Sequence, residues 1–395
     1  MTTLVLNKKY SLSQMAPWLA GMEKEVSLVC GPTVARSQES ETLLRELRHI
    51  EFRPDYSRSE WLVPLCRDLR VERIVATAES DVLRAAYVRQ LLDIPGQSVA
   101  SAIAYRDKYI MKSIAAANGI PVAPMALVRT VADVERFAEI HGFPVLLKPR
   151  AAAACQGMTI VQDLAEARLL PSGLDNIIEA WMDLPLFHVD GLMREGVVLH
   201  CSPSRYALPN LESTTNAQPC VSAMLDPITD PRAALLRRWT AEVVRALPAS
   251  PHTTAFHAEF FCGGDDDVYL CEIACRPGNP VLAEVQERAY GYHLHREVYR
   301  GQIADEEFAL PPAGPAGLFG WAFFPPRDGV LVKAPESPHP DMLWVTSTAS
   351  VGKRYKNPVA PLDHLAKAVF RADRNAVESS LDAIVEWWTE GATWS

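Results

Sequence analysis

The stretch that most constrains this chain runs from His257 to Gly278 and combines two acidic side chains with an arginine. Two short apolar runs flank a Gly/Asp-rich segment, residues 263–267, which is typical of a β-hairpin. The strands of a hairpin return side by side, so Glu259 and Glu272, thirteen positions apart, are expected to face each other. Two facing carboxylates followed by Arg276 favour a hard cation, usually Mg²⁺, bridged to an anion such as phosphate. Taken alone, the pattern is also compatible with two acidic strands around a solvated turn.

Length and composition limit the classes of protein to consider. A chain of 395 residues is expected to divide into two or three domains, and 48% hydrophobic with 22% charged residues is typical of a globular protein. The net charge of −9 argues against nucleic acid or an anionic membrane as the main partner. No apolar run is long enough for a membrane span or a signal peptide, and the eight scattered cysteines are expected to be free thiols. We therefore expect a cytoplasmic protein that binds small molecules.

The first hundred residues alternate short apolar runs with helical patterns, which predicts a small parallel sheet covered on both faces. The segment after the first strand, residues 7–11, contains no glycine, so the dinucleotide-binding fingerprint is absent. Residues 77–80, after a later strand, are still expected to border a ligand.

A lysine at the end of a strand marks the next region. Asp107 and Lys108 precede a helix predicted over 109–118. A strand is predicted over 143–149, with Lys148 near its end. The loop of small residues that follows, 151–157, lets backbone N–H groups approach phosphates while the ammonium group neutralises them. An ordinary strand–loop–strand with a solvated lysine is the alternative. Glu179, at the end of the strand 176–182, is placed to accept from an exocyclic adenine amine.

The part of the chain after Arg276 carries weaker signals. A single helix is predicted over 281–301, and its His293 and His295 point to different faces, which favours packing over joint metal binding. A Pro/Gly-rich linker at 310–317 precedes three strands and a last helix near 375–390.

In this order, the motifs resemble the ATP-grasp superfamily of carboxylate–amine ligases, over nearly the whole chain from Thr77 onward. The amino-acid (dipeptide) ligases are most similar, judged from the motifs Tyr-Arg-Asp-Lys-Tyr-Ile-Met-Lys (105–112), Lys-Pro-Arg (148–150) and Glu-Ile-Ala-Cys-Arg (272–276). The resemblance implies an α/β (α+β) ATP-grasp fold with a Rossmann-like parallel-sheet domain, a small lid domain and a larger antiparallel-sheet domain. The expected boundaries are 1–104 for the N-terminal domain, 105–182 for the lid, 183–310 for the catalytic subdomain and 311–395 for a C-terminal subdomain packed on it.

The resemblance also implies roles for individual residues. Glu259 and Glu272 would carry Mg²⁺, with Mn²⁺ as the alternative metal, and Arg276 would bind the substrate carboxylate and its acyl phosphate. His257, on the same face as Glu259, is a candidate for orienting a substrate, with a structural histidine as the alternative. The expected ATP-binding residues are Lys108, Lys148, Gln156, Gly157, Met158, Glu179, Ala180, Trp181, Met182, His188 and Asp190.

Three departures from the family pattern affect these roles. Ala274 stands where many relatives have a metal-binding asparagine, and Leu186 where a glutamate often holds the ribose. His188 or Asp190 would then replace that glutamate. The loop 151–157 is rich in alanine where relatives use Gly and Ser, so fewer hydroxyl groups would reach the phosphates.

The expected activity is ATP-dependent ligation. A small-molecule carboxylate, such as an amino acid, would be activated as an acyl phosphate and joined to an amine, with ADP and phosphate released, for example in natural-product biosynthesis. Two alternatives stay open: an ATP-grasp enzyme that activates bicarbonate or formate, and a non-catalytic ATP-binding switch. The expected partners are the carboxylate and amine substrates, without nucleic acid or membrane. The oligomeric state stays open, with a homodimer as one candidate.

Overall fold

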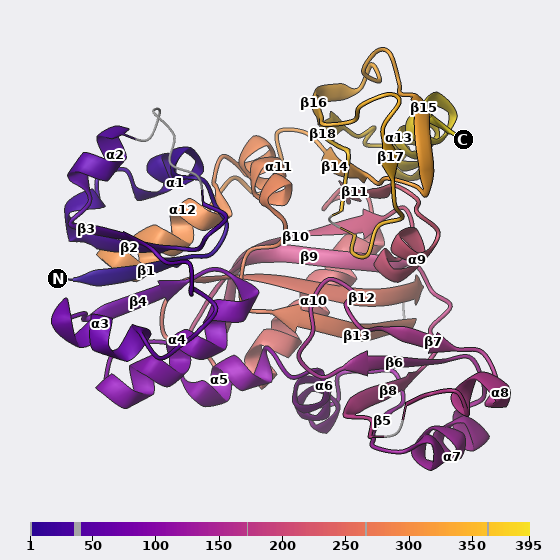
Figure 1. The fold of residues 1–395 in the computed structure, drawn as a ribbon, viewed down its shortest axis with the longest axis horizontal. Coiled ribbons are helices and arrows are strands. Elements are labelled where there is room, and N and C mark those ends of the chain that lie inside the picture. The colour runs from indigo at the N-terminus through magenta and orange to yellow at the C-terminus, as the bar shows by residue number, and fades with distance from the viewer. Residues whose placement is uncertain (1, 35–40, 172, 265–266, 362) are drawn as a thin grey trace.

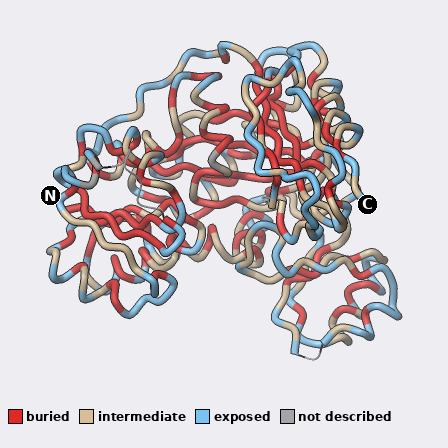
Figure 2. Tube along the Cα trace, turned by 45° about the horizontal axis from the view of Figure 1, so that its top comes forward, coloured by how far each residue is buried: buried red, intermediate tan, exposed pale blue. Residues whose placement is uncertain are grey.

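The computed structural model describes residues 2–34, 41–171, 173–264, 267–361 and 363–395, and in these ranges the chain forms a mixed α/β fold on four sheets. Figure 1 shows the N-terminal unit at one end, a long sheet through the middle, a smaller sheet beside it, and the C-terminal segments at the far end. Buried chain follows the strands of the long sheet, as Figure 2 shows, so the main core lies along it.

The N-terminal unit is a parallel sheet with helices on both faces, as its alternating pattern predicts. Its strand order is β3-β2-β1-β4. The side chains of Val5 and Leu28 pack in a cluster with the first helix, whereas Leu4 and Val29 pack on the opposite face. The elements are β1 (Thr3–Asn7), α1 (Leu12–Leu19), η1 (Glu23–Glu25), β2 (Val26–Cys30), α2 (Glu41–Glu46), β3 (His49–Phe52), α3 (Leu62–Asp68), β4 (Arg73–Ala76), α4 (Glu79–Leu92) and α5 (Val99–Ala104).

The second unit is a four-stranded antiparallel sheet, in the order β5-β8-β6-β7, with its own small core. Its first helix begins at Lys108 because the Asp107 side chain accepts from the backbone N–H groups of Tyr109 and Ile110. The elements are α6 (Lys108–Ala117), β5 (Met125–Val128), α7 (Val131–His141), β6 (Val145–Pro149), β7 (Thr159–Val161), α8 (Leu164–Ala167) and β8 (Asn176–Ala180).

The third unit is an eight-stranded sheet in the order β13-β12-β9-β10-β11-β14-β18-β16. Its last three strands come from residues after 311, so the C-terminal segment continues this sheet, and a boundary at 311 stays a prediction. The elements are β9 (Leu186–Arg194), β10 (Val197–Tyr206), α9 (Asn210–Thr215), β11 (Cys220–Met224), α10 (Pro231–Ala246), β12 (Thr254–Gly264), β13 (Asp267–Ala274), α11 (Pro280–Tyr290), α12 (Leu294–Tyr299), η3 (Arg300–Ala304), β14 (Phe319–Phe324), β16 (Met342–Ser347), β18 (Ala366–Arg371) and α13 (Val377–Gly391).

A three-stranded sheet, β17-β15-β19, completes the C-terminal part with β15 (Gly329–Lys333), β17 (Arg354–Tyr355) and β19 (Thr393–Trp394). None of the helices in the described ranges combines the length and the apolar character that crossing a bilayer requires.

The single helix predicted over 281–301 is wrong. Gly291 adopts a left-handed conformation with φ +80° and ends α11, and His293 caps the separate helix α12. The break turns His295 into the core, where its ring stacks on Trp18 with centroids 4.4 Å apart and its Nε2 lies 2.9 Å from the Tyr10 hydroxyl. The two histidines therefore join α12 to the N-terminal unit, in agreement with the packing role expected from their spacing.

These buried histidines predict a loss of stability in mild acid. Burial lowers the pKa of His295 well below its usual value of 6.5, and lowers the pKa values of His200 and His293 to about 4. Because the unfolded chain takes up protons first, their contribution is complete above about pH 6.5 and is lost as the pH falls toward 4. We expect the free energy of unfolding, measured by urea titration, to decrease over this interval.

The variant His295→Phe tests this expectation. Between pH 7 and 4.5, the unfolding free energy of the variant should fall less steeply with pH than that of the wild type, because up to one proton fewer is taken up on unfolding. At pH 7 the variant should be less stable by about 1 kcal/mol, because the hydrogen bond to Tyr10 is lost. The exposed His141→Phe is the control. An unchanged pH slope in His295→Phe would contradict a neutral buried His295.

Candidate functional site

The two acids of the central hairpin face each other. Strands β12 and β13 pair antiparallel with Glu259 directly opposite Glu272, which confirms the predicted hairpin. Asp265 and Asp266, in the predicted turn, lie outside the described residues. The two carboxylates therefore stand side by side on one face of the long sheet, at the edge nearest the second unit.

Lys108 joins Glu272 to the loop of small residues. Its Nζ lies 2.7 Å from Glu272 Oε2 and donates to the carbonyl oxygen of Ala152 at 2.8 Å. Burial opposes ionisation of Glu272, but Lys108, followed by Lys148 and Arg276, lowers its pKa to about 2. The acid is thus a stable anion over the physiological range.

The loop 151–157 bends sharply over this ion pair. Ala154, Cys155 and Gly157 have φ values of +55°, +59° and +71°. A Cβ on Gly157 would lie 2.8 Å from Pro149 Cγ, so this position requires glycine. Gln156 and Gly157 are exposed and Met158 is half-buried, which leaves their backbone at the surface of the loop. Their predicted contact with phosphates stays a prediction.

A buried glutamate between two lysines lies behind the loop. Lys148 Nζ lies 2.7 Å from Glu179 Oε2, and Lys112 Nζ lies 2.6 Å from Glu179 Oε1. Burial opposes ionisation of Glu179, but the two lysines keep its pKa below the usual value. Sequence reasoning assigned no role to Lys112, although this residue ends the motif 105–112 and lies one helical turn after Lys108.

This triad changes the reading of Glu179. Each of its oxygens has a lysine partner, and the residue is 2% exposed, so its predicted contact with an adenine amine stays a prediction. Ala180, Trp181 and Met182 follow it as half-buried chain leading out of β8, and their backbone groups remain candidates for binding the base.

Arg276 meets the N-terminal unit through Glu79. Arg276 Nε lies 2.5 Å from Glu79 Oε2, and Arg106 donates to the other oxygen of the same carboxylate. Burial opposes ionisation of Glu79, but Arg276 and then Arg106 lower its pKa. Glu79 starts α4 directly after β4, in the segment expected to border a ligand, so the structure brings that segment to the arginine.

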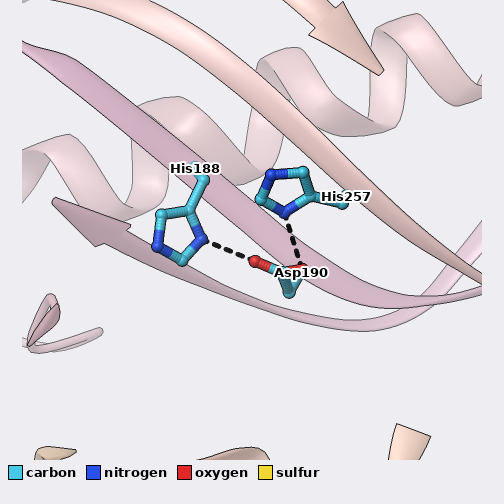
Figure 3. A group of neighbouring side chains, drawn as sticks. All are labelled: His188, Asp190 and His257. Carbon is cyan, nitrogen blue, oxygen red and sulfur yellow. Dashed lines mark hydrogen bonds and ion pairs between the residues drawn. The ribbon is translucent and has the colours of Figure 1, made fainter. Parts of the chain in front are cut away.

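His257 belongs to a buried network, which Figure 3 shows. Its Nδ1 lies 2.9 Å from Asp190 Oδ1, and Asp190 Oδ2 lies 2.6 Å from His188 Nδ1. His188 Nε2 in turn lies 2.6 Å from the Ser222 hydroxyl. Burial opposes protonation of His257, but Asp190 and Glu259 raise its pKa to about 10.

The network bears on two predictions. Both ring nitrogens of His188 and both oxygens of Asp190 have protein partners, and both residues are at most 1% exposed, so their role in holding the ribose stays a prediction. His257 also uses both nitrogens, the second toward Glu259 Oε1 at 3.4 Å. A role in orienting a substrate and a structural role therefore both stay predictions for His257.

Glu259 is held by three donors on one oxygen. In addition to His257, the Tyr206 hydroxyl donates to Oε1 at 3.1 Å and Asn210 Nδ2 donates to it at 2.8 Å. Among the described residues, no hydrogen bond to Oε2 is observed, so this oxygen is the one presented to a ligand. Tyr206 and Asn210 carried no sequence signal, because they reach Glu259 from β10 and from α9.

Comparisons with known proteins agree with this geometry. Residues 107–174 match the family of the carbamoyl-phosphate synthase L chain, ATP binding domain. The L-arginine-specific L-amino acid ligase of Bacillus subtilis is 25% identical over 276 residues, which cover 66% of this chain and 64% of the ligase. The crystal structure of the L-amino acid ligase from Bacillus licheniformis superimposes with a TM-score of 0.75 at 15% identity, covering 100% of this chain and 98% of that chain. These similarities are consistent with an ATP-grasp carboxylate–amine ligase, and the likeness to the solved ligase shows that the chain has the same fold.

The predicted resemblance to ATP-grasp carboxylate–amine ligases is thereby confirmed. A third relative differs in its reaction: the formate-dependent phosphoribosylglycinamide formyltransferase of Rhodococcus jostii is 24% identical over 294 residues, 70% of each chain. This chain spans less than two thirds of the length of the arginine-specific ligase.

Apolar side chains occupy the two positions at which this chain departs from the ATP-grasp pattern. Ala274 lies opposite His257 and is 7% exposed, and Leu186 is 4% exposed in the main core. Neither position offers a side-chain oxygen.

ATP-grasp proteins use ATP and Mg²⁺, and the donor set of this chain fits both. Glu259 presents a carboxylate oxygen without a described partner beside the ionised Glu272, as a hard divalent cation requires. Lys108 and Lys148, whose ammonium groups lie beside Glu272 and Glu179, are the predicted partners of the phosphates.

Proposed function

We propose that this ATP-grasp protein is an ADP-forming ligase that activates the carboxylate of a small molecule, an amino acid, and joins it to an amine. The observation that carries the proposal is the pair of facing carboxylates, Glu259 and Glu272. Lys108 forms an ion pair with Glu272, and Arg276 follows Glu272 by four residues. The similarity to an amino acid ligase over 66% of this chain supports the choice of substrate.

The residues supply what phosphoryl transfer requires. Lys108 and Lys148 bind the phosphates of ATP, with main-chain groups of Gln156, Gly157 and Met158 above them, and Glu259 and Glu272 hold Mg²⁺. When bound by these two acids, Mg²⁺ would neutralise part of the negative charge on the phosphates. Backbone groups of residues 180–182 bind the adenine edge.

Arg276 places the acid. Its guanidinium exchanges Glu79 for the substrate carboxylate, so an oxygen of that carboxylate is aligned with the γ-phosphorus. A bond forms between the carboxylate oxygen and the γ-phosphorus while the bond from the γ-phosphorus to the oxygen that bridges it to the β-phosphate breaks. The products are the acyl phosphate and ADP. The amine nitrogen then attacks the acyl carbon, inorganic phosphate leaves with its electron pair, and the nitrogen loses a proton to give the amide. The loop 151–157 excludes water from the acyl phosphate.

A substrate panel tests the proposal. The protein is incubated with ATP, Mg²⁺ and all pairs of proteinogenic amino acids, phosphate release is recorded, and products are identified by mass. We expect ADP formation that depends on a particular acid and amine, with a product mass lower by one water than their sum.

The alternatives give different results in the same assay. Turnover that depends on bicarbonate or formate instead of amino acids would support the alternative favoured by the formyltransferase relative. ATP binding without ADP release across the whole panel would support a switch protein, which the apolar residues at 186 and 274 motivate.

The three-donor arrangement around Glu259 predicts a change in metal affinity. Removing the amide in Asn210→Ala frees one lone pair of Oε1 and loosens the carboxylate, so the Mg²⁺ concentration for half-maximal activity should rise about 10-fold. Direct Mn²⁺ binding in the presence of ATP, followed by electron paramagnetic resonance, should weaken equally. The exposed Asn216→Ala, just after the same helix, is the matched control and should bind Mn²⁺ like the wild type.

A further inference from the structure

The two histidines and the aspartate of Figure 3 form a chain of hydrogen bonds that ends at Glu259. Strands β9 and β12 pair so that Asp190 lies directly opposite His257, and His188 directly opposite Glu259. Residues two apart on a strand share a face, so all four side chains lie on one face of the long sheet. The pairing of the two strands therefore aligns Asp190 behind the ring of His257, whose Nε2 lies 3.4 Å from Glu259 Oε1.

Asp190 is a costly residue to bury at this place in the sheet. Its side chain is fully buried, and its two oxygens are used by the ring nitrogens of His257 and His188. Apolar side chains of similar volume are often as stable as a buried polar group with its partners, or more stable. Packing alone therefore does not explain an acid here, whereas groups that ligate a metal are commonly oriented by hydrogen-bonded partners behind them.

Gly278 connects the same pair to the segment that carries Arg276. A Cβ at position 278 would lie 2.8 Å from Asp190 Oδ1 and 3.3 Å from His257 Nδ1. The backbone of this glycine, two positions after the arginine, thus packs closely against the Asp190–His257 pair. The pair contacts the proposed metal-binding acid on one side and the segment of the arginine on the other.

We propose that Asp190 is a positioning residue for the metal site and acts on Glu259 through the ring of His257. This inference rests on the proposed function, in which Glu259 holds Mg²⁺. Asp190 fixes the orientation of the ring. The ring, with Tyr206 and Asn210, holds Oε1 of the glutamate, which leaves Oε2 directed toward the metal.

Direct binding of Mn²⁺ tests this role without any turnover. Asp190→Ala removes both acceptors, so the ring of His257 loses its fixed orientation. The dissociation constant of Mn²⁺, measured by electron paramagnetic resonance in the presence of ATP, should rise about 10-fold, and that of ADP without metal should stay unchanged. The matched control is Asp226→Ala, which removes another buried acid, paired with Arg374 at 2.6 Å. It should lower the unfolding midpoint but bind Mn²⁺ like the wild type.

A second variant disturbs the pair without removing a polar group. Gly278→Ala places a methyl group against Asp190 Oδ1, so Mn²⁺ should bind more weakly in this variant too, even if Asp190→Ala fails to fold. A double variant tests the route. In the background His257→Ala, replacing Asp190 should weaken Mn²⁺ binding no further, and additive effects would contradict an action through this ring.

The outcomes separate the positioning role from its alternatives. Unchanged Mn²⁺ affinity in both Asp190→Ala and Gly278→Ala would overturn it and leave the ligase proposal intact. Weaker binding of metal-free ADP with unchanged Mn²⁺ affinity would also overturn it, in favour of the predicted contact with the ribose. A wild type that binds Mn²⁺ but forms no ADP with any substrate pair would refute the ligase, while the Mn²⁺ affinities still test Asp190. A wild type that binds no Mn²⁺ would overturn both proposals.

Discussion

Replacing Glu272 with glutamine is expected to reduce ADP-forming turnover by roughly 10²–10³-fold or more, below detection in a standard phosphate-release assay. Glutamine keeps the size of the side chain but removes the charge that pairs with Lys108 and, by our proposal, holds the metal. The side chain is 24% exposed, so folding should change little, and thermal unfolding of the variant should show a midpoint near that of the wild type.

The control for this variant lies on the same strand. Asp267→Asn makes the same change in charge at the far end of β13 and should retain turnover. If Glu272→Gln retained turnover on a pair of substrates accepted by the wild type, Glu272 would not be a metal ligand, and the assignment of Glu259 would fall with it.

Replacing Glu179 with glutamine is expected to destabilise the fold by about 3–5 kcal/mol, measured by urea denaturation. The side chain is 2% exposed, and its loss of charge leaves Lys112 and Lys148 buried without an anion. An exposed glutamate on the neighbouring helix, changed in Glu139→Gln, should cost less than about 0.5 kcal/mol.

A double variant separates charge from packing. Adding Lys112→Met to Glu179→Gln removes one of the two stranded cations, so the double variant should be more stable than Glu179→Gln alone. If the second change instead lowered stability further, the cost of Glu179→Gln would come from lost packing and not from unpaired buried charge.

The parts of the site that could be predicted from sequence are those fixed by local geometry. The facing of Glu259 and Glu272 follows from the alternation of side chains along two strands joined by a short connection. Lys108 and Lys148 were found from a helix start and a strand end. The break at Gly291 was missed because glycine inside an apolar helical pattern does not by itself show whether the helix continues or ends.

The partners of these residues depend on contacts between distant segments. Asp190 reaches His257 across 67 positions because β9 lies beside β12, and Glu79 reaches Arg276 across 197 positions. A shift of one residue in the pairing of β9 and β12 would turn Asp190 to the other face of the sheet. Sequence alone does not fix that register, so the contact between Asp190 and His257 could not be predicted, whereas the hairpin was predicted correctly. The suggestion that His188 or Asp190 holds the ribose stays a prediction.

The contact between Lys108 and Glu272 gives the site a means of discrimination. An anion that arrives alone and takes Lys108 leaves the Glu272 carboxylate without its partner, so part of the attraction is cancelled. An anion that arrives chelated to a divalent cation satisfies the lysine and the glutamate together. If Lys108 binds phosphate and Glu272 binds the metal, as we propose, this ion pair disfavours free phosphate and sulfate relative to a metal-bound nucleotide.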